Sequence, residues 1–121
     1  MTYIQGFLAP VKTAKKAGYK DIAEKSWALF KEYGAVSSCE GWGDTVPDGE
    51  VTSFPMAVKK EPDETVVFSW IVWPDKQTAD AAMAKMQDDP RWGEIMPNAD
   101  EIFSLKRMMF GGFEPILDQT A

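Results

Sequence analysis

The sequence contains no histidine and a single cysteine, Cys39, and these scarcities exclude several chemistries. Without histidine the chain has no Ser/His/Asp triad, no Cys/His dyad, no proximal haem ligand and none of the common zinc sites. A lone cysteine forms no intrachain disulfide, which favours a cytoplasmic protein. No histidine can act as a base for Cys39, so we interpret it as a small apolar side chain. We predict no metal and no cofactor.

Basic residues are also scarce, since 13 Lys and Arg face 19 Asp and Glu and give a net charge of −6. Phosphate backbones are bound by clustered Lys and Arg. The one small cluster contains Lys12, Lys15, Lys16 and Lys20, and we interpret it as the solvated start of a helix. We therefore expect no nucleic-acid partner.

No stretch approaches the roughly 18–20 apolar residues that a membrane helix requires. The first ten residues lack the basic flank and apolar core of a secretory signal. We therefore expect no membrane partner and a cytoplasmic location. The length of 121 residues, with 45% hydrophobic and 26% charged residues, is typical of one folded domain, residues 1–121.

The most strongly patterned stretch is residues 65–73, TVVFSWIVW, whose β-branched and aromatic residues predict a strand. Successive side chains of a strand point to opposite faces. One face then carries Val66, Phe68, Trp70 and Val72. The opposite face is apolar as well, so both faces need to be covered.

The remaining pattern predicts three more strands and two helices. They are expected as strands at residues 2–10, 35–43 and 105–113 and as helices at 13–33 and 75–88. Pro10 is expected to end the first strand, Thr13 to cap the first helix and Gly34 to stop it. The glycines and polarity of 35–43 indicate an edge strand.

Two further segments are irregular in pattern. Residues 44–64 contain several proline and glycine turn signals and predict a long loop of the kind that binds ligands or covers sites. Asp89 and Pro90 predict the start of a short helical turn. The apolar tail at residues 114–117 is expected to dock on protein rather than extend into water.

The order of elements is β-α-β-β-α-β, so we predict an α+β, ferredoxin-like fold with a four-stranded antiparallel sheet. Two helices cover one face of such a sheet. A tryptophan side chain exposed to water on the other face loses roughly 4–6 kcal/mol of gross hydrophobic stabilisation relative to a buried one. We therefore expect a homodimer in which two subunits pack sheet to sheet.

Three stretches resemble a known family. They are CEGWGDTVPDG at residues 39–49, ETVVFSWIVWP at 64–74 and RMMFGGFEPILD at 107–118. Together they resemble the small bacterial YbaA-like family, catalogued as domain of unknown function 1428. The resemblance covers nearly the whole chain and implies pairing as a dimeric α+β barrel, similar in architecture to antibiotic-biosynthesis monooxygenases. It implies no particular activity.

Six residues are candidate ligand contacts. They are Glu40, Trp42, Asp44, Ser69, Trp70 and Arg107. Trp42 and Asp44 form a pocket rim in one interpretation and an ordinary strand end in another. If Glu40 faces the barrel interior, it could act as a general base. If it faces water, its charge serves to prevent this edge strand from pairing with the edge strand of another molecule. Arg107 is a possible partner for Glu40 or for an anionic ligand.

Three functions remain open at this point. The first is a homodimer that binds a small apolar or aromatic molecule. The second is a cofactor-independent monooxygenase-like or isomerase-like enzyme, which rests on analogy between folds. The third is a structural or partner-binding dimer without a ligand.

Overall fold

Four strands form one antiparallel sheet in the computed structural model, which describes residues 2–121. The strands are β1 (Tyr3–Lys12), β2 (Ser37–Trp42), β3 (Glu64–Trp73) and β4 (Met109–Phe113). Their spatial order is β2-β3-β1-β4, so β1 and β3 are central and β2 is an edge strand, as its composition indicates. This confirms the α+β, ferredoxin-like fold.

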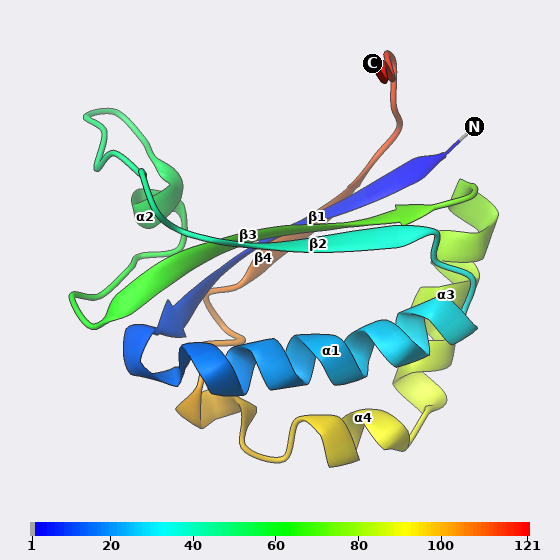
Figure 1. Ribbon diagram of the computed structural model, residues 1–121, viewed down its shortest axis with the longest axis horizontal. Helices are drawn as coiled ribbons and strands as arrows, with labels where there is room; N and C mark the ends of the chain where they lie inside the picture. Colours follow the sequence, from blue (N-terminus) through cyan, green and yellow to red (C-terminus); the bar gives the residue numbers. More distant parts are fainter. Residues whose placement is uncertain (1) are drawn as a thin grey trace.

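The helices α1, α3 and α4 lie on one side of the sheet (Figure 1). The helices are α1 (Lys16–Glu32), α2 (Phe54–Ala57), α3 (Lys76–Asp88) and α4 (Arg91–Ile95), with 3-10 turns at Thr13–Lys15 and Ala99–Glu101. Within residues 2–121, no helix combines the length and the apolar character needed to cross a bilayer.

The core lies between the sheet and the helices, because the odd-numbered residues of β1 and β3 point there. Trp73 is fully buried, and its indole N–H donates to Gln5 Oε1 at 2.8 Å. One cluster contains Leu29, Tyr33, Ile71, Trp73, Ala79, Ala82 and Trp92. A second contains Ala9, Val11, Ile22, Val67, Ala99 and Phe103. The helix layer therefore covers the central strands of one face of the sheet.

The helix boundaries follow local capping. Gly34 adopts a positive φ of 109° at the end of α1, as predicted. Asp75 caps α3 by accepting from the backbone N–H of Thr78 at 2.7 Å. Thr13 does not cap α1; its hydroxyl instead pairs with that of Thr65 at 2.7 Å.

Pro10 does not end β1, which continues to Lys12. The Pro10 carbonyl accepts from Ser104 N on the β4 side, so its missing N–H also faces that side. The pairing between β1 and β4 has already ended there, at Leu8 and Met109. The ladder with β3 therefore loses nothing at the proline.

Two other expectations need correction, and the expected docking of the tail is not met within its own chain. The last strand begins at Met109 rather than residue 105, because the Met108 N–H bonds back to the Ser104 carbonyl at 3.2 Å in a turn. The long loop at 44–64 contains the short helix α2. The tail does not dock on its own chain, since Ile116 is 100% exposed and Leu117 is 73% exposed.

Candidate functional site

The sheet separates two hollows, because alternate side chains of each strand point to opposite faces. The first lies on the helix side, between α1, the sheet and the residues around α4. The second lies on the opposite face, which α1, α3 and α4 leave uncovered and which we call the open face. The short helix α2 lies on that side, with Phe54 packed against Phe68. The two differ in chemistry, and we describe each in turn.

The helix-side hollow has two connected parts. An outer groove of about 410 Å³ lies between α1, which contributes Tyr19, Ala23 and Trp27, and β2, which contributes Glu40 and Trp42. An inner chamber of about 160 Å³ shares Tyr19, Ala23, Trp27 and Glu40 with the groove. The chamber is otherwise walled mainly by apolar and aromatic side chains, including Phe7, Phe30, Trp92 and Phe103. Apolar walls with few polar groups are typical of small-molecule sites.

A polar group lies where the groove meets the chamber. Glu40 is paired with Ser69 across β2 and β3, so both side chains point to the helix side. The Tyr19 hydroxyl of α1 donates to Glu40 Oε2 at 2.9 Å. The helix and the strand thus bring a phenol, a hydroxyl and a carboxylate together.

Glu40 is an exposed residue at the sheet edge, but its carboxyl group is partly buried against Tyr19 of α1. This burial raises the pKa of Glu40, and hydrogen bonds with Tyr19 and Ser69 only partly offset it. Burial and the nearby Glu40 charge also raise the pKa of Tyr19. The pair therefore offers a carboxylate that takes up a proton more readily than an ordinary glutamate.

The rim of the outer groove carries positive charge. Lys16 Nζ lies 5.3 Å from the centroid of the Trp42 ring, in a cation–π contact. Lys20, one turn further along α1, also lines the groove and lies 3.9 Å from Glu24. The groove therefore has aromatic walls and a cationic end.

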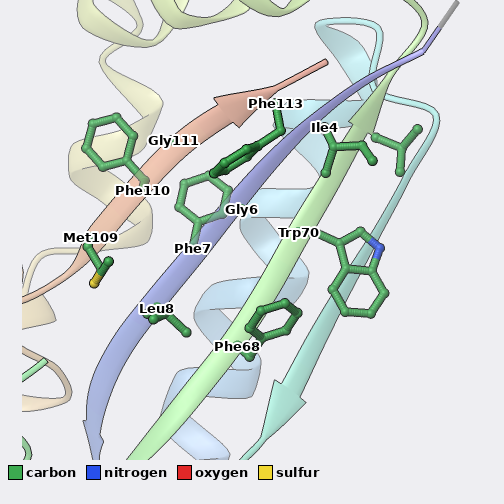
Figure 2. Close-up of a pocket in the computed structure, with 11 residues that line it drawn as sticks. Ile4, Gly6, Phe7, Leu8, Phe68, Trp70, Met109, Phe110, Gly111 and Phe113 are labelled. Carbon is green, nitrogen blue, oxygen red and sulfur yellow. The ribbon is translucent and has the colours of Figure 1, made fainter. Parts of the chain in front are cut away.

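The hollow on the open face is almost entirely apolar and has a volume of about 530 Å³. Figure 2 shows Phe68 and Trp70 of β3 on one side and Met109 and Phe113 of β4 on the other. Gly6 and Gly111 face each other across β1 and β4, and the Phe113 ring lies over both of them. This hollow offers contact area but no polar group that would orient a ligand.

The structure brings three of the six candidate residues together and separates the others. Glu40, Trp42 and Ser69 face the helix side. Trp70 lies on the open face, on the other side of the sheet (Figure 2). Asp44 borders a separate hollow of about 210 Å³ beside Phe54 and Phe68.

Arg107 is not a partner of Glu40, which corrects the suggested pairing. Its two terminal nitrogens contact the Glu64 carboxylate at 2.7 and 2.6 Å, and one of them also contacts the Lys59 carbonyl at 2.9 Å. The Glu64 side chain is 1% exposed, and this contact lowers the pKa of Glu64. Arg107 therefore holds the segment before β4 against the start of β3.

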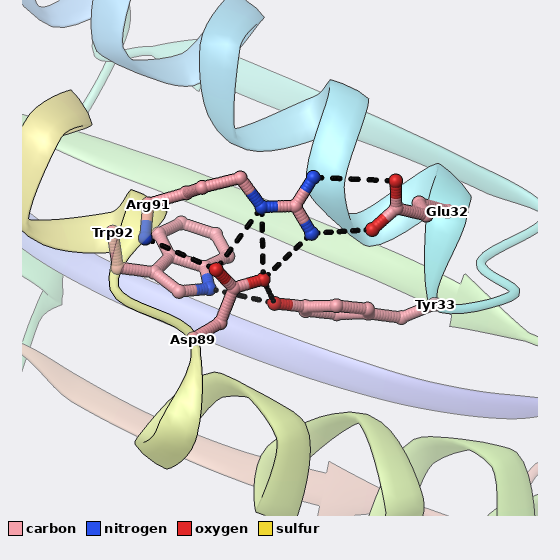
Figure 3. A network of polar contacts seen from close by, with 5 residues as sticks. All are labelled: Glu32, Tyr33, Asp89, Arg91 and Trp92. Atoms are coloured by element: carbon pink, nitrogen blue, oxygen red, sulfur yellow. Dashed lines mark hydrogen bonds and ion pairs between the residues drawn. The ribbon is translucent and has the colours of Figure 1, made fainter.

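A second polar network connects α4 to the end of α1 (Figure 3). Arg91 forms ion pairs with Glu32 and Asp89, while the Tyr33 hydroxyl donates to Asp89 at 2.6 Å. The Trp92 indole N–H donates in turn to the Tyr33 hydroxyl at 3.1 Å. Every member has a partner within the network, so we interpret it as a structural tie between helices.

Within residues 2–121, no cluster of three or more His, Cys, Asp or Glu side chains is placed to hold a metal ion. Cys39 is a free thiol, and it is exposed. It pairs with Trp70 across β2 and β3 and so belongs to the open face.

Residues 2–104 match the model of the family described as protein of unknown function (DUF1428). The chain belongs to this family. Uncharacterized protein YbaA of Escherichia coli strain K12 is 50% identical over 122 residues, which cover 98% of this chain and 100% of that protein. The protein of the same name from Shigella flexneri matches over the same extent at the same identity. The resemblance seen in the sequence is confirmed.

Solved structures share the fold at low sequence identity. A mutant of SnoaB, a cofactor-independent oxygenase from Streptomyces nogalater, has a TM-score of 0.61 at 15% identity, covering 97% of this chain and 95% of that one. An uncharacterized NIPSNAP-like domain protein from Burkholderia xenovorans has a TM-score of 0.60 at 12% identity, with 99% and 90% covered. These likenesses show that the chain shares the fold of these proteins.

In this member of the DUF1428 family, the sequence pattern missed two residues of the helix-side hollow. Tyr19 has the spacing of the apolar face of the first helix, and that spacing gives its hydroxyl no signal of its own. Trp27 falls outside that spacing, yet it lines both parts of the hollow. A tyrosine and a tryptophan two turns apart on α1 are the only sequence signal that points to them.

Proposed function

We propose that this protein is a homodimer in which each subunit binds a small apolar or aromatic molecule in its helix-side hollow. The observation that carries the proposal is the connected groove and chamber, whose apolar walls converge on the polar group of Glu40, Tyr19 and Ser69. Apolar walls supply affinity, and the few polar groups fix the orientation of the ligand.

The open face supports the dimer. Phe68 is 46% exposed and Phe113 is 61% exposed, and both border one continuous apolar hollow. Covering these side chains with a second copy recovers about 25 cal/mol for each Å² of apolar surface buried. The exposed thiol of Cys39 suits a reducing compartment, so we also propose a cytoplasmic location.

A cavity-filling variant tests the binding proposal. Ala23 lines both parts of the hollow, so Ala23→Phe places an aromatic ring inside it. Ala28→Phe adds the same ring at an exposed position of the same helix and is the matched control. The measurement is the melting temperature of each protein against a panel of small apolar and aromatic compounds.

We expect some compounds to raise the melting temperature of the wild type and of Ala28→Phe but not of Ala23→Phe. The proposal fails if no compound stabilises the wild type, or if Ala23→Phe retains the full response. The third function, a dimer with a filled interior, is not favoured because the hollow is present.

A second candidate function is cofactor-independent chemistry, with Glu40 as general base. The raised pKa of Glu40 and its contact with Tyr19 at the mouth of the chamber favour this candidate. SnoaB, which shares the fold, is a cofactor-independent oxygenase, and this suggests a reaction class by analogy between folds.

Oxygen uptake and solvent deuterium exchange, measured on a panel of phenols and enols, test the second candidate. A general base typically contributes about 10²–10⁴-fold to the rate. We expect Glu40→Gln to lose about that much activity and Glu24→Gln, at the groove rim, to lose little. Equal turnover by Glu40→Gln and the wild type would remove Glu40 from the mechanism.

A further inference from the structure

The rim of the outer groove is positively charged, whereas the chain as a whole is negatively charged. The net charge is −6, yet four lysines lie between residues 12 and 20. Lys12 is bound to Asp63 at 2.9 Å, outside the groove. Lys16 and Lys20 line the groove itself. The groove mouth therefore presents two ammonium groups on an otherwise acidic protein.

These two lysines differ in their partners. Lys20 lies 3.9 Å from Glu24, at the outer limit of an ion pair. Within residues 2–121, no carboxylate lies within ion-pair distance of Lys16. Its ammonium group lies over the face of the Trp42 ring instead. An ammonium group without an acidic partner is available to an anion.

The acidic side chains that also line the groove do not cancel this charge at its outer end. Glu24 lies beside Lys20. Glu40 lies two residues before Trp42 on the same face of β2, and two residues of a strand span about 7 Å. The Tyr19 hydroxyl donates a hydrogen bond to Glu40. The groove is therefore cationic beside Trp42, whereas Glu24 and Glu40 supply negative charge further along it.

The aromatic walls and the free ammonium group lie next to each other. An anionic group bound to Lys16 would stand beside the Trp42 ring, because Lys16 Nζ is only 5.3 Å from the centroid of that ring. The apolar body of the same ligand could then contact Trp42 and Trp27 within the groove. Charge and apolar surface are thus spaced for one amphipathic molecule.

We propose that the ligand of the outer groove is an aromatic anion, a carboxylate or phenolate whose charged group binds Lys16 and whose ring lies against Trp42. Lys20 adds a second positive charge at the mouth. This inference rests on the proposed function and specifies its ligand class.

Two probes of the same shape test the charge requirement. Naphthoate and naphthamide, substituted at the same ring position, differ in charge and hardly in size. Their affinities are measured by isothermal titration at low salt. An exposed ion pair contributes up to about fivefold in affinity, so naphthoate should bind about fivefold more tightly than naphthamide.

Lys16→Gln removes the charge and keeps most of the side-chain length. We expect it to weaken naphthoate about fivefold and to change naphthamide by less than about twofold. Lys31→Gln is the matched control, because Lys31 is an exposed lysine near the other end of α1. It should leave both affinities unchanged.

The indole N–H resonances of the tryptophans locate the probe. Shifts of Trp27 and Trp42 support the groove, whereas shifts confined to Trp70 place the probe on the open face and overturn the inference. Equal affinity for the two probes, or a Lys16→Gln variant with unchanged preference, overturns the anion requirement and leaves apolar binding intact. Failure of both probes to bind contradicts the proposed function itself.

Discussion

Glu40 is the residue whose chemistry depends most on its position in the fold. It belongs to an edge strand, but its side chain points toward α1 and accepts a hydrogen bond from Tyr19. The sequence allowed two interpretations of Glu40, and the structure has features of both: the side chain lies on the helix side beside Tyr19, while the residue is exposed at the sheet edge. The burial that raises the pKa of Glu40 also makes its ionisation costly to the folded state.

Glu40→Gln should therefore change the pH dependence of stability. The pKa of Glu40 is raised in the folded protein above its ordinary value of 4.5. The resulting stabilisation is fully present below the unfolded pKa and is lost as the pH rises through the folded pKa. Glutamine is neutral throughout and still accepts from Tyr19, so the variant avoids this loss.

Urea denaturation at about pH 4 and about pH 7 measures the effect. We expect Glu40→Gln to match the wild type in acid and to equal or exceed its stability at neutral pH. A variant that is less stable at neutral pH, by an amount that persists in acid, would contradict the account.

Arg107 provides a second prediction at this scale. Arg107→Leu leaves the Glu64 carboxylate buried without its cation, and breaking a buried pair costs about 3–5 kcal/mol. We expect about 3 kcal/mol, the low end of that range, because the Arg107 side chain is itself 24% exposed. Lys106→Leu, at an exposed neighbouring position, should have little effect.

Two further observations check this assignment. The double variant Arg107→Leu with Glu64→Leu should recover much of the lost stability, because no buried charge remains. The contact lowers the pKa of Glu64, so its stabilisation is present above the unfolded pKa and is lost as the pH falls. The deficit of Arg107→Leu should therefore shrink in acid, and a constant deficit would count against the ion pair.

Some of these placements follow from the sequence and others do not. Alternation along 35–43 is sufficient to put Glu40 and Trp42 on one face of a strand. Alternation along 65–73 also separates Ser69 from Trp70, so the six candidates never formed a single site. The pair of Arg107 and Glu64 joins positions 43 residues apart through a turn that the apolar pattern does not specify. This ion pair could therefore be identified only from the folded structure.

At the scale of elements, β2 depends on a close approach to β3. A Cβ atom on Gly41 would lie 2.9 Å from the Phe68 carbonyl oxygen, which belongs to the backbone of a central strand. Gly41→Ala should therefore destabilise the protein by about 1–3 kcal/mol, as overpacking does. Gly93→Ala is the control: nothing lies within 4 Å of its Cβ, and a helical alanine should stabilise by up to about 1 kcal/mol.

Thermal or urea unfolding of the two variants checks this prediction. Equal effects of Gly41→Ala and Gly93→Ala would show that β2 does not need the close approach. The glycines of 35–43 correctly indicated an edge strand, but the sequence alone did not reveal which glycine faces a backbone oxygen.

The elements themselves were largely predictable. The strands β1 and β3 and the helices α1 and α3 have strong apolar periodicity, and each lies within a few residues of its expected bounds. The predicted start of β4 was wrong because residues 105–108, LKRM, mix apolar and basic side chains in a way that is equally typical of the end of a strand. Their backbone instead bonds back to Ser104. Hydrophobic pattern does not distinguish a short turn from a strand end.

The whole molecule has one covered face and one uncovered face. The helix layer covers the odd-numbered side of β1 and β3 and leaves the helix-side hollow beneath it. Four side chains of the open face are at least one-third exposed: Phe68, Trp70, Met109 and Phe113. Ile116 and Leu117 of the apolar tail are also largely exposed. The homodimer predicted from the two-sided apolar strands stays a prediction, and it accounts for both features.

Sedimentation equilibrium at low micromolar concentration tests the central claim most directly. The account predicts a stable particle with twice the 13.5 kDa mass of the chain. It also predicts that Phe68→Asp, which places a charge on the open face, yields a folded monomer. Val51→Asp, at a loop position that is 96% exposed, should stay dimeric. A wild-type protein that sediments as a folded monomer, with its open face in water, would contradict the account.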